Sequence, residues 1–255
     1  MEPARNVHDG HSLSPLGDTI KEIPKSNASM VSSDISIPAR PHPFPFDGAH
    51  TALIAIDLQK DFCHPEGYCG QVLNADLTGL QAIVPRVQQL IAWARQRDIW
   101  IIYTRESHRP DLRDLTPSKK LRYINAGYPV GSLGKLGRFL IAGEAGTQLL
   151  EEFQPLENEL VLDKPAQSIF VATDLEARLR SRGITHLLFA GVTTQCCVLG
   201  SYRHASDLGF YGLLLEDCCA ALTPSEHQAA LEVITSEGGA IGWVSTSKAL
   251  MEAVG

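Results

Sequence analysis

The chain has 255 residues, of which 44% are hydrophobic and 20% are charged, with a formal net charge of −7. This composition is ordinary for a soluble globular protein, and the acidic balance argues against nucleic acid or an anionic membrane surface as the main partner. No apolar run approaches the ~20 residues of a transmembrane helix, and the first residues lack the basic start and apolar core of a secretory signal.

Residues 1–48 differ in composition from the rest of the chain. They are rich in Pro, Ser, Asp and Asn and end in a run with prolines at nearly every second position. Alternate prolines force the backbone to be extended. We therefore predict an extended or disordered N-terminal arm over 1–48 and a single domain over 49–255. Phe44 and Phe46 are candidates to anchor this arm on the domain or on a neighbouring subunit, and a disordered leader is the alternative.

From Ala49 onward, apolar strand patterns alternate with helical patterns. The predicted strands are 51–56, 99–103, 159–162, 185–190, 211–215 and 240–243. The predicted helices are 77–97, 173–181, 195–208, 225–236 and 247–253, with a helical turn at 149–153 and a long loop from 104 to about 146. Thr173 and Glu176 predict a capping box at the start of the second helix. Uninterrupted apolar strands separated by helices indicate an α/β fold, a three-layer α/β/α domain with a mostly parallel six-stranded sheet.

Three chemically useful side chains follow predicted strands. Asp57 follows the first strand, Lys164 the third and Cys197 the fourth. In parallel sheets the functional groups gather at the carboxyl ends of the strands. We therefore expect these three side chains to lie together, although each alone is more often a turn residue, a surface charge or a core filler.

This set of residues suits nucleophilic catalysis on an amide. Cys197 follows a strand at the start of a helix, where free N–H groups and the helix dipole favour a thiolate. A carboxylate can remove the thiol proton and later return it to the leaving amine, and an ammonium group beside both favours the thiolate. Backbone N–H groups between Thr193 and Cys197 are candidates to stabilise the oxyanion. Such a site requires neither a metal nor an organic cofactor.

At this point the sequence resembles the isochorismatase-like cysteine hydrolases. The resemblance is carried by the segments AIDLQKDF at 55–62, LDKP at 162–165 and GVTTQCCV at 191–198. It implies that Asp57 is the general base, Lys164 the supporting cation and Cys197, rather than Cys196, the nucleophile. It also implies a Rossmann-like fold and a cis peptide bond before Thr193.

Within this family the sequence is most similar to biuret hydrolases and related ureide amidohydrolases. The similar segments are TRESHRPDL at 104–112, LLEDCC at 214–219 and EGG at 237–239. The resemblance implies a cysteine-dependent amidohydrolase that cleaves a small ureide (biuret-, triuret- or ureidoacrylate-like) through a thioester and releases ammonia. The residues expected to contact substrate are Phe62, Arg105, Glu106, His108, Arg109 and Glu237. Biuret hydrolases carry glutamine where this chain has Glu237, and a carboxylate there accepts hydrogen bonds but donates none.

Other readings of the same residues stay open. Phe62 also suits a core position, and His108 and Arg109 suit a surface role. Nicotinamidases of this superfamily bind a metal through an aspartate and two histidines, whereas the matching loop here offers only His108, so we predict no metal site and no cofactor. The alternatives are a nicotinamidase-type or isochorismatase-type hydrolase, or a non-catalytic metabolite-binding relative.

Six cysteines occur at 63, 69, 196, 197, 218 and 219, without the spacing of a secreted disulfide framework or a zinc site. We therefore expect reduced thiols and a cytoplasmic location. The expected partner is a small ureide or amide, with no nucleic acid and no membrane. The resemblance implies a homo-oligomer, either a dimer or a tetramer.

Overall fold

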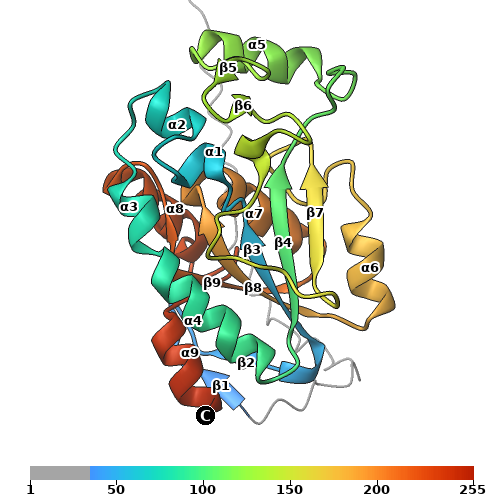
Figure 1. Cartoon of the computed structure of the whole chain (residues 1–255). Helices are drawn as coiled ribbons and strands as arrows, with labels where there is room; N and C mark the ends of the chain where they lie inside the picture. The colour runs from blue at the N-terminus through green and yellow to red at the C-terminus, as the bar shows by residue number, and fades with distance from the viewer. Residues whose placement is uncertain (1–34) are drawn as a thin grey trace, which may run out of the picture. The chain divides into compact units, whose positions relative to one another are not determined.

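The computed structural model describes residues 35–255, which are built around one six-stranded parallel sheet (Figure 1). The strand order is β10-β9-β8-β3-β4-β7. The strands are β3 (Thr51–Ile56), β4 (Trp100–Glu106), β7 (Leu160–Lys164), β8 (His186–Val192), β9 (Tyr211–Ala220) and β10 (Trp243–Ser245). The predicted parallel α/β sheet is confirmed. Within the described residues, no helix combines the length and apolar character needed to cross a membrane.

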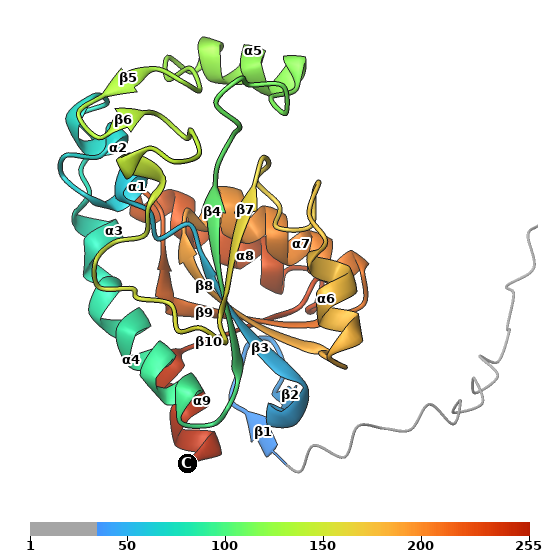
Figure 2. The same ribbon diagram turned by 45° about the vertical axis from the view of Figure 1, so that its right-hand side comes forward.

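Helices cover both faces of this sheet and make three layers (Figure 2). One face packs on α3 (Thr78–Ala82), α4 (Val84–Arg95) and α9 (Ser247–Val254). The other packs on α6 (Leu175–Ser181), α7 (Leu199–Asp207) and α8 (Pro224–Thr235). Side chains of β3 alternate between the two cores: Leu53 and Ala55 enter the first, while Ala52, Ile54 and Ile56 enter the second. Because successive strand side chains point to opposite faces, an all-apolar strand such as β3 fits this central, doubly covered position.

Several predicted elements differ in detail. The helix predicted over 77–97 is divided at Ile83 into α3 and α4, with Pro85 in the first turn of the second helix. The last strand begins at Trp243, after positive-φ glycines that include Gly239 and Gly242. Residues 149–153 form a bridge and a turn in place of the predicted helical turn. The predicted capping box is wrong, because Asp174 is the N-cap residue of α6 and the Thr173 hydroxyl donates to Ile169 O.

The predicted arm is described only from residue 35, and residues 1–34 lie outside the described residues. Strands β1 (Ile35–Ile37) and β2 (Phe44–Phe46) pair antiparallel, and η1 (Gly48–His50) leads into β3. Phe44 and Phe46 are buried in the same core cluster as side chains of α4 and α9. Arg40 forms an antiparallel bridge with Val244 of β10, with N–O distances of 2.8 and 3.0 Å. The domain boundary at residues 48 and 49 stays a prediction.

The segment predicted as a long loop lies above the carboxyl ends of β4 and β7 and contains helix α5, Pro117–Asn125 (Figure 1). The remaining short elements near this end are α1 (Lys60–Cys63), α2 (Tyr68–Gln71), β5 (Leu133–Gly134), β6 (Gly137–Arg138) and η2 (Ala145–Thr147). A small apolar cluster of Tyr68, Val130, Phe139, Leu140 and Ile141 holds this segment together. The Thr116 hydroxyl accepts from Lys119 N and Pro117 occupies the first turn, which explains why a helix starts there.

Candidate active site

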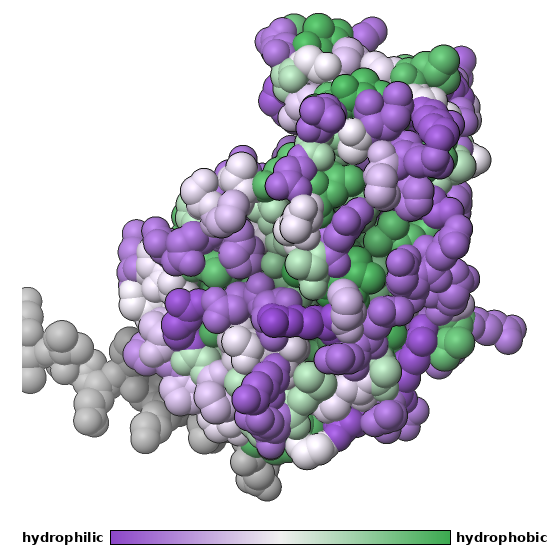
Figure 3. All heavy atoms as spheres, turned by 60° about the vertical axis from the view of Figure 1, so that its left-hand side comes forward, coloured by the Kyte–Doolittle hydropathy of each residue, from purple (hydrophilic) through white to green (hydrophobic). Residues whose placement is uncertain are grey.

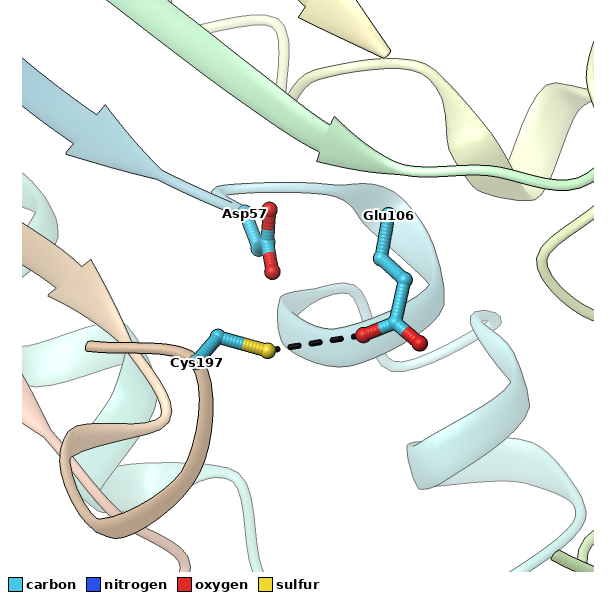
Figure 4. Close-up of side chains that lie close together, drawn as sticks. All are labelled: Asp57, Glu106 and Cys197. Atoms are coloured by element: carbon cyan, nitrogen blue, oxygen red, sulfur yellow. Dashed lines mark hydrogen bonds between the residues drawn. The ribbon is translucent and has the colours of Figure 1, made fainter. Parts of the chain in front are cut away.

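Four buried side chains from four different strand ends meet at the carboxyl edge of the sheet. Asp57 follows β3, Glu106 ends β4 and Lys164 ends β7. Cys197 lies in the short π-helix η3 (Thr194–Val198), which follows β8. Figure 4 shows the Asp57 and Glu106 side chains pointing toward the Cys197 sulfur from two sides. The structure therefore brings together the three residues that the sequence predicted, with Glu106 as a fourth.

Asp57 and Lys164 form a completely buried ion pair. The Lys164 Nζ lies 2.8 Å from Asp57 Oδ2, and both side chains are fully inaccessible to solvent. The Thr104 hydroxyl donates to Asp57 Oδ1 at 2.7 Å, and the Asp57 amide donates to Thr104 O at 3.1 Å. Burial opposes the charge on Lys164, but Asp57 and the other nearby acids outweigh it and raise the pKa of this ammonium. The pair therefore keeps a permanent cation beside the carboxylate.

Glu106 is a buried carboxylate with several donors. Lys119 Nζ lies 2.5 Å from its Oε1, and the Tyr123 hydroxyl donates to the same oxygen at 2.9 Å. Lys164 Nζ lies 3.9 Å from Oε2. Burial alone would raise the pKa of Glu106, but Lys164 and Lys119 outweigh it and lower that pKa to about 2. Glu106 is therefore an anion at any physiological pH.

The Cys197 thiol donates a hydrogen bond to Glu106 Oε2 across 3.4 Å (Figure 4). The neighbouring Cys196 side chain and burial raise the pKa of the Cys197 thiol, and Asp57 and Glu106 act in the same direction against Lys164. This reverses the expectation that the turn favours a thiolate at rest. The resting nucleophile is a protonated thiol, which needs a base before it can attack.

The turn that carries Cys197 has the backbone that the family resemblance implied. The peptide bond between Val192 and Thr193 is cis. The Thr193 carbonyl accepts hydrogen bonds from the amides of Cys196 and Val198, the residues on either side of Cys197. Thr193 and Cys197, the expected oxyanion donors, both line the cavity described next.

A cavity of about 220 Å³ opens onto the Cys197 side chain. Its walls come from the α1–α2 region, from the segment around α5, from η3 and from the start of α8. The lining residues are Phe62, Cys69, Leu73, Glu106, Tyr123, Tyr128, Phe139, Val192, Thr193, Gln195, Cys196, Cys197, Leu222 and Glu226. Figure 3 shows a hollowed face of the molecule on which apolar atoms lie recessed between hydrophilic side chains. The volume suits a small molecule.

Two of the six residues expected to contact substrate, Phe62 and Glu106, line this cavity, and the other four lie elsewhere. Arg105 pairs with Asp163 and Gln148. Arg109 is exposed and bonded to Asp111.

His108 and Glu237 complete this group of four. His108 is buried, with its Nε2 2.9 Å from Lys119 Nζ. Burial and Lys119 lower the pKa of His108, so its ring is neutral. Glu237 is exposed, in the turn after α8.

Sequence reasoning missed the residues that hold Glu106 in place. Lys119 and Tyr123 come from α5, and Lys119 also donates to Pro165 O at 2.8 Å. The Gln59 amide donates to Glu106 O and accepts from Glu106 N, at 3.0 and 2.7 Å. The Thr116-Pro117 pair is a helix-start signal that would have identified α5.

The cluster of Asp57, Glu106 and Cys197 has the donor atoms of a metal site, all within 4.8 Å of one another. The Lys164 ammonium already lies among these donors, 2.8 Å from Asp57 and 3.9 Å from Glu106. A metal ion there would have to displace a buried cation that is already paired, so these residues fit a metal poorly. That the protein uses no metal stays a prediction.

Comparisons with known proteins agree with this architecture. The family model described as "Isochorismatase domain" matches residues 51–249. Ureidoacrylate amidohydrolase RutB of Caulobacter segnis is 31% identical over 222 residues, covering 84% of this chain and 89% of that protein. The same enzyme of Enterobacter sp. is 32% identical over 223 residues, covering 86% and 95%.

Solved structures have the same fold. A cysteine hydrolase from Pseudomonas syringae has a TM-score of 0.70 at 23% identity, covering 87% of this chain and 98% of that one. A pyrazinamidase/nicotinamidase from Streptococcus mutans has a TM-score of 0.61 at 25% identity, covering 76% and 99%.

Proposed function

This chain belongs to the isochorismatase family, and we propose that it is a cysteine-dependent amidohydrolase that cleaves the C–N bond of a small ureide and releases ammonia. One observation carries the proposal. The Cys197 thiol opens into a small cavity and donates to Glu106 at 3.4 Å, while Asp57, paired with Lys164 at 2.8 Å, lies within 4.8 Å of the sulfur. These positions support a site in which a nucleophile, a proton acceptor and a fixed cation act on one substrate carbonyl.

In the first half of the reaction, Asp57 takes the proton of the Cys197 thiol as the sulfur attacks the substrate carbonyl. The carbonyl oxygen becomes an oxyanion, which the amides of Thr193 and Cys197 stabilise by hydrogen bonding. The tetrahedral intermediate then collapses, the C–N bond breaks, and protonated Asp57 gives its proton to the leaving nitrogen. Ammonia leaves, and the acyl group remains on sulfur as a thioester.

In the second half, water replaces ammonia. Asp57 takes a proton from the water, and the water oxygen attacks the thioester carbonyl. The C–S bond breaks, and the sulfur recovers its proton from Asp57. The products are the free acid and the resting thiol, so protons balance over the cycle. The Lys164 cation compensates the negative charge of Asp57 whenever that carboxyl is deprotonated.

The family resemblance assigns the role of base to Asp57, and the position of its carboxylate, within 4.8 Å of the sulfur, is consistent with that role. Glu106 is the nearer acceptor of the thiol hydrogen, but its pKa of about 2 makes it too weak to take up and return a proton near neutral pH. Glu106 therefore orients the thiol and contacts the substrate, and Asp57 moves the proton.

Biuret-, triuret- and ureidoacrylate-like ureides are the proposed substrates. The names of the RutB relatives support a ureide, and the cavity of about 220 Å³ is large enough for each of these molecules. A homo-oligomeric state and a cytoplasmic location are further predictions, from the family resemblance and from the cysteine pattern respectively.

The test is an ammonia-release screen over biuret, triuret, ureidoacrylate and nicotinamide. We expect the wild-type protein to release ammonia from at least one ureide, and Cys197→Ala to release none. Cys218→Ala is the matched comparison and should retain most of the activity, because Cys218 is buried in the core and does not line the cavity. Ammonia release by Cys197→Ala, or activity on nicotinamide alone, would contradict the proposal.

A further inference from the structure

The buried part of the site has no net charge to offer a ligand. Two carboxylates, Asp57 and Glu106, face two ammonium groups, Lys164 and Lys119. Lys119 uses its three N–H donors on Glu106, His108 and Pro165. Lys164 contacts Asp57 and donates to Ala166 O at 2.9 Å. Lys119 is therefore fully used within the protein, and neither lysine is among the residues that line the cavity.

The cavity wall adds no further cation. None of the residues lining it is Lys, Arg or His within the described part of the chain. The charged lining side chains are both acidic: Glu106 inside, and Glu226 on the exposed first turn of α8. A substrate carboxylate would lose its hydration there and gain no ionic partner, which is a large penalty.

The polar groups that remain are suited to N–H donors. Gln195 lines the cavity, and its side-chain oxygen is buried without a hydrogen-bond partner among the described residues. Glu106 Oε2 accepts only the weak thiol donor among the hydrogen bonds of the described residues. Both oxygens would be satisfied by the N–H groups of a ureide.

We infer that the site selects neutral ureides, rich in N–H groups, and rejects ureides that carry a carboxylate. This inference rests on the proposed amidohydrolase function and refines it. It separates this chain from relatives whose name refers to ureidoacrylate, which is an acid. Gln195 and Glu226 are the specificity-determining residues, the first through its free acceptor and the second through its charge at the cavity mouth.

The experiment compares a matched pair, ureidopropionamide and ureidopropionate, which differ only in an amide against a carboxylate. Cleavage at the ureido end releases ammonia and a carbamic acid, which loses CO2, so the reaction is followed through the β-alaninamide or β-alanine that remains. We expect kcat/KM to be at least about 100-fold higher for the neutral compound, because the acid brings an unpaired charge into the site. Equal values, or a preference for the acid, would overturn the inference.

A second measurement separates this inference from the hydrolase proposal. Calorimetric binding of both compounds to Cys197→Ala reports the charge preference even if wild-type protein cleaves neither. Binding of the neutral compound with no detectable binding of the acid supports the inference. Tighter or equal binding of the acid, or no binding of either, contradicts it.

Charge variants at the cavity mouth test whether Glu226 contributes to the preference for neutral ureides. Glu226→Lys places a cation on the exposed rim of the cavity. It should lower the ratio of kcat/KM for the neutral compound to kcat/KM for the acid by about 3- to 10-fold, since exposed charges are partly screened. Glu232→Lys, six residues further along α8 and also exposed, is the matched control and should leave this ratio unchanged. Equal ratios in the two variants would overturn the role assigned to Glu226.

Discussion

Lys119 Nζ lies 2.5 Å from Glu106 Oε1, and both side chains are buried. The lysine belongs to α5, in the segment above the sheet, whereas the glutamate ends a central strand. This contact fixes the position of α5 relative to the Cys197 thiol, because Glu106 contacts both partners. It makes α5 part of the candidate active site rather than a separate cover.

Replacing Lys119 should therefore disturb the site through its direct contact with Glu106. In Lys119→Met, Glu106 keeps only Lys164 as a cation, so the pKa of Glu106 should rise. We expect kcat/KM to fall by about 10- to 100-fold and its acid limb to move to higher pH, with a loss of about 2 to 4 kcal/mol in unfolding free energy. Lys120→Met, at the exposed neighbouring position, is the control for the ureide assay and for urea unfolding. A pH profile unchanged from wild type would contradict this positioning role.

Asp57 and Glu106 should differ in their importance to the reaction. Asp57→Asn removes the proposed proton acceptor, and kcat/KM should fall by about 10²- to 10⁴-fold. Glu106→Gln keeps an oxygen that accepts from the thiol, so we expect a smaller loss, about 10-fold. Asp163→Asn, next to Lys164 but outside the cavity, should have little effect. If Glu106→Gln were inactive and Asp57→Asn active, Glu106 would be the proton acceptor and Asp57 would not.

Asp61 should make stability depend on pH. Burial raises the pKa of its carboxyl from 3.8 to about 6, against the lowering effect of the Leu140 amide. Because the folded-state pKa is raised, the contribution of Asp61 to stability is complete below about pH 3.8 and is lost as pH rises through about 6. The loss is on the order of 3 kcal/mol.

Urea unfolding of Asp61→Asn measures this effect. Relative to wild type, the variant should gain stability between about pH 4 and pH 6 and then level off, because asparagine does not ionise. Asp98→Asn, at an exposed position after α4, is the control. A stability difference that stays constant over this range would show that Asp61 does not titrate there.

Gly191 is required at the end of β8. Its φ is +123°, and a Cβ there would lie 2.1 Å from Ile56 O and 2.6 Å from Ile56 N. Gly191→Ala should destabilise the protein by about 3 kcal/mol or more and reduce ammonia release, because the turn that carries Cys197 starts there. Gly79→Ala in α3, where the nearest atom is 3.5 Å away, should be neutral or stabilise by up to about 1 kcal/mol. Equal stability of the two variants in urea unfolding would contradict this account.

The convergence of Asp57, Lys164 and Cys197 could be predicted from the sequence, because each follows an apolar strand and parallel strands end at the same edge. Lys119 and Tyr123 could not be placed in the same way. Their helix is mostly polar and lies in a segment rich in Gly and Pro, so its position depends on tertiary contacts with Glu106 and with the small apolar cluster. Strand alternation also explains why Arg105 lies outside the cavity, since it is adjacent to Glu106 on β4 and points to the opposite side.

The bridge between Arg40 and Val244 has a consequence for how the chain can be shortened. Strand β10 is the outermost strand of the sheet, and the Arg40 backbone occupies hydrogen-bonding groups on its otherwise open side. The family match begins at residue 51, so a truncation chosen from that match would remove this cover together with Phe44 and Phe46. An unpaired edge beside newly bared aromatic surface is a template for intermolecular strand pairing. A protein trimmed in this way would tend to self-associate, even though every side chain around Cys197 would still be present.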